Sequence, residues 1–484
     1  MDRPLLSLDL GTTGVRAVVF GADGRTLGSA YARLALTYPA PDRIEQDALD
    51  FCTRSSEVIR RALTEARCAP GDLRGLGIVT QRSSVVAWNS VTGRPLAPVI
   101  GWQDRRTLPR VNELRALGLP VNTLASCTKF EWLVREDAAV RAAAHRGQLR
   151  FGTPDVWLTS WLTGGEAFVT DPSCAGATGL IDPSAEGWLG PALELFEQED
   201  AWHPSLVATN AVVGMTDPKV FGAAIPVAAR AGDQQAACFA QGVHRIGDAK
   251  LTFGTSAMLD RCTGPTPSEA PAGAYDLPLW RLLAADGLVE NAFCHEGTVI
   301  TAGAAIEWLQ RIGVLESVAE LDALATAGRP GVTFVPALAG LGTPYMADQA
   351  RGSFAGLGLD TERAELVRGV LDGIAQRGAD LATALDVTGT LHVDGGLSQS
   401  SWLMQRLADL TGCTVLRASE VETTARGGAA LAASSPELPG GPLPPAAPAA
   451  RIEPAVAPAE REELRAAWRT HIARLVRDDA NEVS

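Results

Sequence analysis

The chain has 484 residues, of which 46% are hydrophobic and 20% are charged, so it can form a sizeable core and is not a disordered protein. Acidic residues outnumber basic ones by 56 to 42, giving a net charge of −14. This charge argues against a general binder of nucleic acid or membrane surfaces, but it allows a small anionic ligand in a local site. At roughly 150 residues per domain, the length predicts two or three domains.

Lysine occurs only at Lys129, Lys219 and Lys250, and arginine supplies every other basic side chain. None of the three lysines follows Gly or precedes Ser or Thr, so the chain has no P-loop. The Val-Ala-Ile-Lys strand of protein kinases is missing as well. If the protein handles ATP, it must therefore hold the phosphates in another way, and we attribute the scarcity of lysine itself to composition bias.

Motifs of several other protein classes are missing from the sequence. The eight cysteines form no Cys-x-x-Cys pair, the six histidines show no metal-ligand spacing, and there is no Gly-x-Ser-x-Gly motif. The N-terminus has no long apolar region, and no stretch approaches ~18 apolar residues. We expect a cytoplasmic protein that does not insert into membranes, and homo-oligomerisation stays open.

The first half of the chain alternates between strand and helix patterns. Residues 5–20, LLSLDLGTTGVRAVVF, predict a β-hairpin with an unusually polar tip. Asp47 is a predicted N-cap for a helix over 47–66. A strand at 76–81 and an apolar segment at 85–88 follow, then helices around 106–117, 130–144 and 155–163.

The second half contains a similar strand–turn–strand unit at 249–261, AKLTFGTSAMLDR, which hints at two similarly built halves. Helices are predicted at 301–312, 361–385 and 401–411, the last after a strand ending in Asp394-Gly395-Gly396. The Pro/Ala-rich segment 436–450 is typical of a linker or surface crossing. In the terminal helix, one apolar face predicts packing on the body; it carries Leu464, Trp468, Ile472 and Leu475.

Two turns could hold phosphate groups. In Asp9-Leu10-Gly11-Thr12-Thr13-Gly14-Val15-Arg16, glycines let backbone N–H groups form an anion nest, and Arg16 adds charge. Asp9 at the strand end could meet a metal ion. Gly254-Thr255-Ser256 is a second phosphate candidate, although either turn could be an ordinary one.

Asp233, in the sequence AGDQQ, and the glycine pair at 395–396 add two further candidates. An Asp at a strand-to-helix junction is either a helix cap or a general base for a substrate hydroxyl. The glycine pair either allows close approach of a ligand or forms a simple turn.

The order of these segments resembles the actin-like ATPase and sugar-kinase superfamily, and more narrowly the glycerol kinase branch of the FGGY carbohydrate kinases. Four further segments carry the resemblance: 77–107 (GIVTQRSSVVAWNSVTGRPLAPVIGWQDRRT), 126–136 (SCTKFEWLVRE), 340–357 (GLGTPYMADQARGSFAGL) and 422–433 (ETTARGGAALAA). The resemblance implies an α/β, two-domain actin-like ATPase (ribonuclease H-like) fold with a catalytic cleft between the domains. It places the phosphate hairpin and polyol pocket in residues 1–242 and the nucleotide site in residues 243–484.

The resemblance also implies roles for individual residues. Asp233 would be the general base, and Asp9 and Asp233 would place Mg²⁺. ATP would be held by Thr12, Thr13, Arg16, Thr255, Gly303, Glu307, Gly396 and Ser400. The polyol would be bound by Arg82, Ser83, Trp102, Leu124, Asp233, Gln234 and Met258. The implied reaction is ATP-dependent phosphorylation of a small polyol, with glycerol as the leading acceptor.

The chain departs from the glycerol kinase pattern where the acceptor is chosen. Glycerol kinases carry Glu, Tyr and Phe at the positions of Ser83, Leu124 and Met258. A buried hydroxyl left without a partner costs ~1–3 kcal/mol, so the acceptor could instead be another polyol or a ketose such as erythritol or xylulose. Xylulose is less favoured because xylulokinases carry Met-His where this chain has Arg82-Ser83. A nucleotide-dependent regulatory protein without transferase activity is the alternative from another class.

Overall fold

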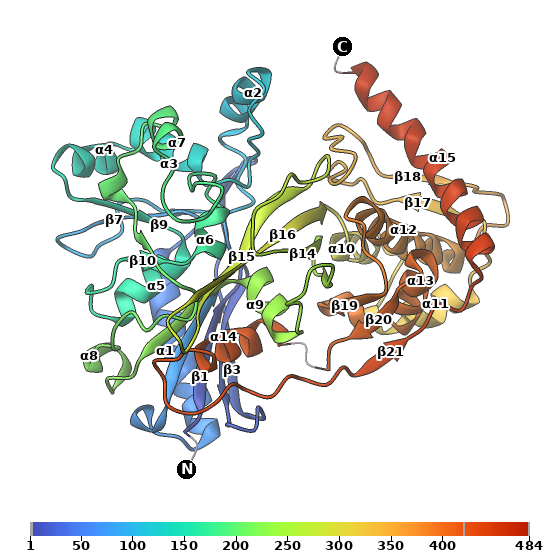
Figure 1. The fold of residues 1–484 in the computed structure, drawn as a ribbon. Helices are drawn as coiled ribbons and strands as arrows, with labels where there is room; N and C mark the ends of the chain where they lie inside the picture. The colour runs from blue at the N-terminus through green and yellow to red at the C-terminus, as the bar shows by residue number, and fades with distance from the viewer. Residues whose placement is uncertain (1–2, 420–421, 483–484) are drawn as a thin grey trace.

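The computed structural model describes residues 3–419 and 422–482 and divides them into two lobes (Figure 1). The N-terminal lobe is built on a five-stranded sheet in the order β12-β6-β1-β2-β3. The pairs β1–β2 and β2–β3 are antiparallel, whereas β1–β6 and β6–β12 are parallel. Its strands are β1 (Leu5–Leu10), β2 (Gly14–Phe20), β3 (Thr26–Arg33), β6 (Gly75–Thr80) and β12 (Val227–Gly232).

The C-terminal lobe is built on a seven-stranded sheet in the order β15-β16-β14-β13-β19-β20-β21. From β16 to β20 this sheet repeats the directions found from β3 to β12, with two antiparallel pairs followed by two parallel pairs. The prediction of two similarly built halves is therefore confirmed. The strands are β13 (Ala249–Phe253), β14 (Ala257–Gly264), β15 (Tyr275–Leu283), β16 (Val289–Val299), β19 (Thr390–Asp394), β20 (Thr414–Arg417) and β21 (Ala450–Ile452).

Helices cover both faces of the N-terminal sheet. On one face α1 (Ala48–Ala66) and α5 (Pro154–Leu162) share a core with β1 and β2. On the other face α9 (Asp233–Ala240) and α14 (Thr423–Ala433) pack together and against β1, β6 and β12. The lobe also contains α2 (Leu108–Ala116), α3 (Cys127–Glu136), α4 (Ala138–His145), α6 (Pro172–Gly176), α7 (Gly190–Leu195), α8 (Pro218–Phe221), β4 (Thr37–Ala40), β5 (Arg43–Gln46), β7 (Val86–Asn89), β8 (Val99–Ile100), β9 (Leu149–Gly152), β10 (Val169–Thr170) and β11 (Ser205–Leu206).

The C-terminal lobe packs its helices around the long helix α12 (Arg363–Ala384). Its remaining elements are α10 (Gly303–Arg311), α11 (Leu321–Ala327), α13 (Ser401–Thr411), α15 (Pro458–Glu482), β17 (Thr333–Val335) and β18 (Ser353–Ala355). The predicted packing of the terminal helix is confirmed, because Trp468 and Ile472 of α15 are buried in a cluster with Val335 and Leu341.

Most predicted elements agree with the structure. The side chain of Asp47 caps α1 as predicted, with Oδ1 accepting a hydrogen bond of 2.8 Å from the N–H of Leu49. The single helix predicted at 130–144 is wrong, because the chain breaks at Asp137. Asp137 leaves the helical conformation, and its carboxylate accepts hydrogen bonds from the N–H groups of Ala139 and Val140 to begin α4.

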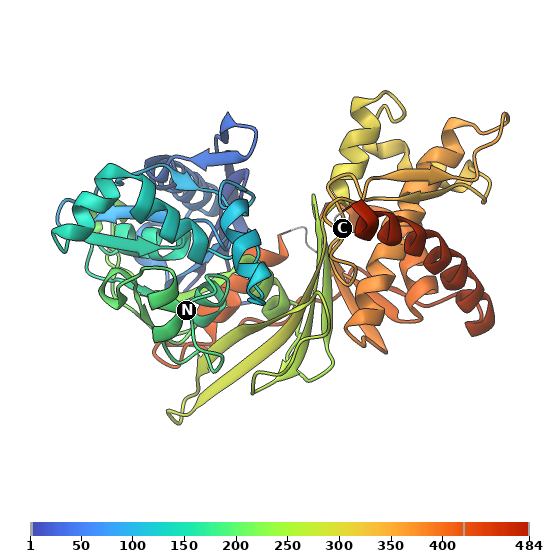
Figure 2. The same ribbon diagram turned by 90° about the horizontal axis from the view of Figure 1, so that it is seen from above.

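The chain crosses between the lobes more than once. After β20 it returns to the N-terminal lobe as α14, and the Pro/Ala-rich segment 436–450 then leads to β21 on the C-terminal sheet (Figure 1). The predicted surface crossing is thus a connection between lobes. Figure 2 shows the lobes side by side, with the long strands β14, β15 and β16 reaching from the C-terminal lobe toward the N-terminal one. Among the described helices, none has the length and apolar character needed to cross a membrane.

Candidate active site

A cavity of about 570 Å³ opens between the lobes, a volume typical of small-molecule sites. The N-terminal lobe contributes the turn after β6, the loop after β8 and the start of α9. The C-terminal lobe contributes β14, β15 and β16. The wall formed by the C-terminal lobe is held in place by hydrogen bonds between the lobes. One of them runs from the N–H of Thr209 to the carbonyl of Arg281 at 2.7 Å. The cavity therefore includes residues from both lobes, among them Met258 of the predicted polyol set.

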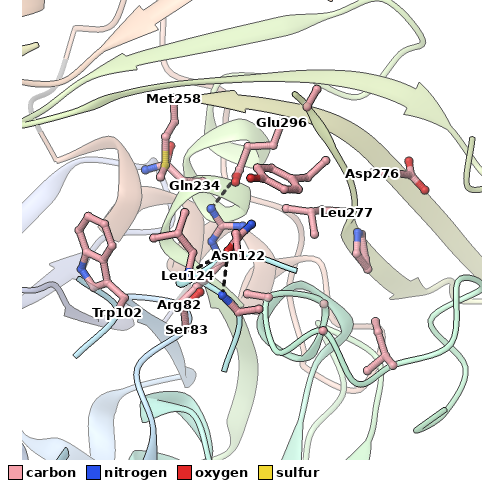
Figure 3. Close-up of a pocket in the computed structure, with 18 of the residues that line it drawn as sticks. Arg82, Ser83, Trp102, Asn122, Leu124, Gln234, Met258, Asp276, Leu277 and Glu296 are labelled. Atoms are coloured by element: carbon pink, nitrogen blue, oxygen red, sulfur yellow. Dashed lines mark hydrogen bonds and ion pairs between the residues drawn. The ribbon is translucent and has the colours of Figure 1, made fainter. Parts of the chain in front are cut away.

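The structure brings the predicted acceptor residues together on this cavity (Figure 3). They arrive from separate segments: the turn after β6, the loop after β8, the loop before α3, the first turn of α9, and β14. The set on the cavity wall is Arg82, Ser83, Trp102, Leu124, Asp233, Gln234 and Met258.

Asp233 is the first residue of α9 and lines the cavity, and its side chain is 32% exposed. Its Oδ1 accepts a hydrogen bond of 2.8 Å from the N–H of Gln234. Burial raises the pKa of Asp233, while the charge of Arg82 opposes the rise. A carboxylate at a cavity wall with a raised pKa is suited to accept a proton from a ligand hydroxyl.

Arg82 lies buried between two carboxylates. Its Nη2 donates a hydrogen bond of 2.5 Å to Oε2 of Glu296, and its Nε lies 3.8 Å from Oδ1 of Asp233. Burial raises the pKa of Glu296 to about 7, against the effect of Arg82. Glu296 lies on β16 and lines the cavity, yet the sequence analysis missed it. One signal could have indicated its role: Glu296 is the single carboxylate in the buried part of β16.

The cavity is directly connected to the predicted phosphate hairpin between β1 and β2. Nε1 of Trp102 donates a hydrogen bond of 2.8 Å to Oγ1 of Thr12. Thr12 itself lines the cavity, whereas Thr13 at the hairpin tip is exposed. Arg16 forms an ion pair with Glu422, in the turn before α14, and its guanidinium lies 5.3 Å from the ring centre of Tyr31.

Asp9 lies near the end of β1, where burial raises its pKa to about 7. The negative charge of Asp233 adds to this rise, and Arg16 opposes it. Carboxylates that hinder each other's ionisation are suited to share a divalent cation. The donor set of Asp9 and Asp233 therefore fits Mg²⁺.

The other predicted nucleotide residues lie in the C-terminal lobe. The exposed turn at Thr255 rests on the start of α10, where the N–H of Gly303 donates a hydrogen bond of 2.9 Å to the carbonyl of Gly254. A Cβ at Gly303 would lie 2.5 Å from that carbonyl oxygen, so this contact requires glycine. Glu307 is exposed on the same helix.

Gly396 and Ser400 lie between β19 and α13. Gly396 is exposed with open space beside it, as a site of close ligand approach requires. The hydroxyl of Ser400 is instead used within the protein: it accepts a hydrogen bond of 3.0 Å from the N–H of Leu403 and donates one to Asp322. Among the described cavity-lining residues, Thr12 is the one member of the predicted nucleotide set.

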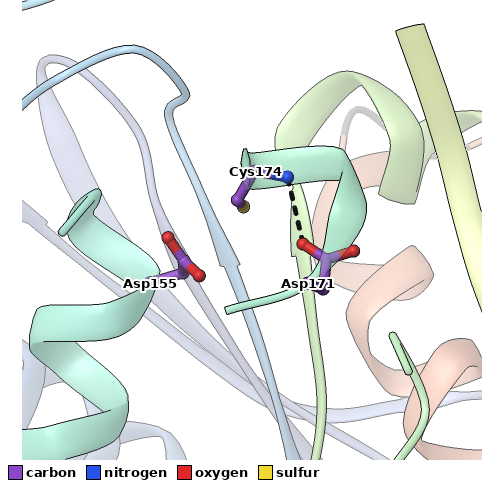
Figure 4. Close-up of side chains that lie close together, drawn as sticks. All are labelled: Asp155, Asp171 and Cys174. Carbon is purple, nitrogen blue, oxygen red and sulfur yellow. Dashed lines mark hydrogen bonds between the residues drawn. The ribbon is translucent and has the colours of Figure 1, made fainter. Parts of the chain in front are cut away.

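A buried group of Asp155, Asp171 and Cys174 has the composition of a metal site (Figure 4). Its carboxylates already accept hydrogen bonds from hydroxyl and amide groups, and burial raises the pKa of the Cys174 thiol. Asp171 accepts a hydrogen bond from Ser173, whose Oγ accepts one of 2.8 Å from the N–H of Gly232. The group thus supports the strand end that presents Asp233.

The two domain descriptions of one known family match the chain. Residues 5–240 match the N-terminal domain of the FGGY family of carbohydrate kinases, and residues 249–435 match its C-terminal domain. The chain is 38% identical to the glycerol kinase of Bordetella parapertussis over 446 residues, which cover 88% of each chain. It is 35% identical to glycerol kinase 2 of Thermotoga maritima, over 97% of this chain and 98% of the relative.

Solved structures show the same fold. The glycerol kinase of Plasmodium falciparum with ADP superposes with a TM-score of 0.88 at 23% identity, covering 98% of both chains. A ligand-bound xylulose kinase of Lactobacillus acidophilus gives a TM-score of 0.84 at 19% identity, covering 97% of this chain and 98% of that one. The sheets and lobes agree with the predicted actin-like ATPase fold. The chain belongs to the FGGY family of carbohydrate kinases, which are phosphotransferases with an alcohol group as acceptor.

Proposed function

We propose that the protein transfers the γ-phosphoryl group of ATP to a hydroxyl of a small polyol, converting glycerol to glycerol 3-phosphate. The observation that carries this proposal is the pairing of Asp233 with Arg82 on the wall of the interdomain cavity. The similarity to glycerol kinases over most of the chain supports glycerol as the acceptor. The eight unpaired cysteines support a reducing, cytoplasmic setting.

In this mechanism Asp233 accepts the proton of the reacting hydroxyl as the oxygen of that hydroxyl bonds to the γ-phosphorus. ADP leaves with the electrons of the broken bond. The raised pKa of Asp233 brings the base closer to neutral pH, where proton transfer is most effective. Arg82 and Gln234 orient the remaining hydroxyls, and Trp102 provides an apolar wall for the carbon chain.

The phosphates of ATP would be held by the two hairpin turns facing each other across the lobes. Thr12 and Thr13 offer hydroxyl and backbone donors from one side, and Thr255 offers them from the other. Arg16 would exchange its partner Glu422 for a phosphate oxygen, because both are anionic. Gly303, Glu307, Gly396 and Ser400 would lie along the nucleoside.

Asp9 and Asp233 are the residues that would hold Mg²⁺. When bound, Mg²⁺ neutralises charge on the phosphates during transfer. Asp9 suits this role because the negative charge of Asp233 adds to the rise of its pKa, and a cation between them would relieve that repulsion.

A different acceptor is the second candidate, and the cavity wall favours it in one respect. Leu124 and Met258 are apolar, and Ser83 is too short to replace a carboxylate. A longer polyol such as erythritol, or a ketose such as xylulose, would place more carbon against this wall.

A panel of acceptors tests the proposal. The purified chain is given ATP and Mg²⁺ with glycerol, erythritol or xylulose, and ADP release is measured against a reaction without acceptor. We expect glycerol to give the highest kcat/KM. A higher kcat/KM for erythritol or xylulose would make that compound the acceptor in place of glycerol. ADP release no faster than in the reaction without acceptor would favour a regulatory nucleotide-binding protein.

Asp233→Asn is the matched control for this panel. The amide keeps the size of the side chain but accepts no proton, so turnover should fall by at least ~100-fold while ATP binding persists. Unchanged turnover would refute the role of Asp233 as the base.

A further inference from the structure

The distribution of lysine in the structure bears on the acceptor site. The chain uses arginine for 39 of its 42 basic side chains and lysine only at positions 129, 219 and 250. Lys219 is exposed on α8, as expected of an ordinary surface base. Lys129 and Lys250 are both completely buried, and both donate to segments that line the acceptor cavity.

Lys129, in the first turn of α3, connects two separate parts of the cavity wall. Its Nζ donates hydrogen bonds of 3.2 Å to the carbonyl oxygens of Ser83 and Trp102. The hydroxyl of Ser126 donates to the same Ser83 carbonyl, also at 3.2 Å. One ammonium group thus holds the turn that carries Arg82 against the loop that carries Trp102.

The turn that Lys129 holds has an uncommon backbone conformation. Ser83 has a φ of +66°, and the N–H of Ser84 bonds back to the carbonyl of Arg82 at 2.8 Å. A side chain other than glycine stays in this region only where its surroundings fix it. The donors from Lys129 and Ser126 provide that constraint, and the resulting turn directs Arg82 toward Glu296 and Asp233.

Lys250, on β13 of the C-terminal sheet, acts in the same way on another part of the wall, the start of α9. Its Nζ donates a hydrogen bond of 2.7 Å to Oε1 of Gln234 and one of 2.8 Å to Oγ1 of Thr252. Oδ2 of Asp260 lies 3.4 Å away. With its oxygen held by Lys250, the amide of Gln234 turns its NH₂ group away from the lysine, leaving it free to donate to a ligand hydroxyl.

We propose that Lys129 and Lys250 are positioning residues of the acceptor site, and that each requires the compact terminal nitrogen of lysine. Lys129 places one donor atom between the carbonyls of Ser83 and Trp102, and Lys250 places one between Gln234 Oε1 and Thr252 Oγ1, whereas a guanidinium is a wide planar fork. This explains lysine at these positions in a chain that otherwise uses arginine. The proposal rests on the assignment of the cavity to the acceptor.

Kinetics of Lys129 variants test the proposal with whichever acceptor the wild type phosphorylates. For Lys129→Met, which keeps length but removes the donors, we expect KM for the acceptor to rise at least tenfold while KM for ATP changes less than twofold. Lys129→Arg should give the same loss, and Lys219→Met should match the wild type. Lys250→Met should likewise raise KM for the acceptor while leaving KM for ATP nearly unchanged.

Two outcomes would overturn the proposal. A Lys129→Met protein that is less heat-stable but keeps its KM for the acceptor would show a purely structural lysine. A Lys129→Arg protein with wild-type kinetics would contradict the requirement for a compact terminal nitrogen. If Lys129→Met does not fold, Ser126→Ala removes the other donor to the Ser83 carbonyl and should still raise KM for the acceptor, by a smaller factor; an unchanged KM would count against the proposal.

A crystal structure of Lys129→Met separates this proposal from the proposed function. If no acceptor is phosphorylated even by the wild type, the proposed function fails, but the positioning role still predicts a local change. Ser83 should leave the left-handed region and Arg82 should lose its hydrogen bond to Glu296. An unchanged turn would refute the positioning role by itself.

Discussion

Gly427 in α14 offers a sharp test of how the C-terminal segment supports the active site. A Cβ at this position would lie 1.9 Å from the carbonyl oxygen of Ala236 and 2.4 Å from its carbonyl carbon. Ala236 belongs to α9, the helix that begins with Asp233. Gly427→Ala therefore forces α14 and α9 apart, since both contacting groups are backbone.

The size of the effect follows from these distances. Ordinary contacts begin near 3.4 Å, so the helices must separate by about 1.5 Å or tilt. Overpacking of this kind costs ~1–3 kcal/mol, and the better helix propensity of alanine offsets about 1 kcal/mol of it. Activity should suffer more than stability, because displacement of a catalytic group by about 1 Å can cost ~100-fold in rate.

The assay compares kcat/KM and the unfolding temperature of Gly427→Ala with those of Gly190→Ala. Gly190 is the first residue of α7, is exposed, and has no atom within 4 Å of a Cβ, so alanine there should change neither quantity. Wild-type kcat/KM in Gly427→Ala would refute the view that α14 fixes the position of Asp233.

Three further outcomes are expected. Arg82→Met should destabilise the protein by ~3–5 kcal/mol in urea unfolding, because it removes the ion-pair partner of the buried Glu296 carboxylate, whereas Glu296→Gln should cost less; equal losses would contradict this. Burial lowers the pKa of Lys129 to about 7, so above that pH the unfolded chain binds more protons and stability should rise with pH. Between pH 7 and pH 9 the free energy of unfolding of the wild type should rise by about 2 kcal/mol relative to that of Lys129→Met. If the unfolding free energies of the two proteins depend on pH in the same way, the lowered pKa of Lys129 is excluded. Chelation of Mg²⁺ by EDTA should abolish turnover until Mg²⁺ is restored, and residual full activity would argue against a cation site at Asp9.

The sequence was informative where local signals determine structure. The two polar hairpin tips, the cap at Asp47 and the strand-to-helix junction at Asp233 each depend on residues close in the chain, and the structure contains all of them. The order of these segments, with the resemblance it supports, was enough to predict the two related lobes.

Long-range features could not be predicted in this way. Glu296 reaches the cavity only because strands of one lobe extend to the other, and nothing within β16 indicates its ion pair with Arg82. Likewise, the glycines of α14 require no special backbone conformation of their own. Glycine is needed there because the backbone of Ala236 in α9 approaches Gly427, and the side chains of Ser7 and Val79 in the sheet approach Gly428; these residues are close in space but far away in sequence.

The return of α14 to the N-terminal lobe has a consequence for biosynthesis. The face of the first sheet that it covers includes Leu5, Val18 and Val79, which are synthesised long before it. The part of that apolar face that α14 covers stays open until residues 423–433 leave the ribosome, and such surfaces are sites of aggregation and chaperone binding. A chain stopped before residue 423 would lack the closing helix of the lobe that was synthesised first.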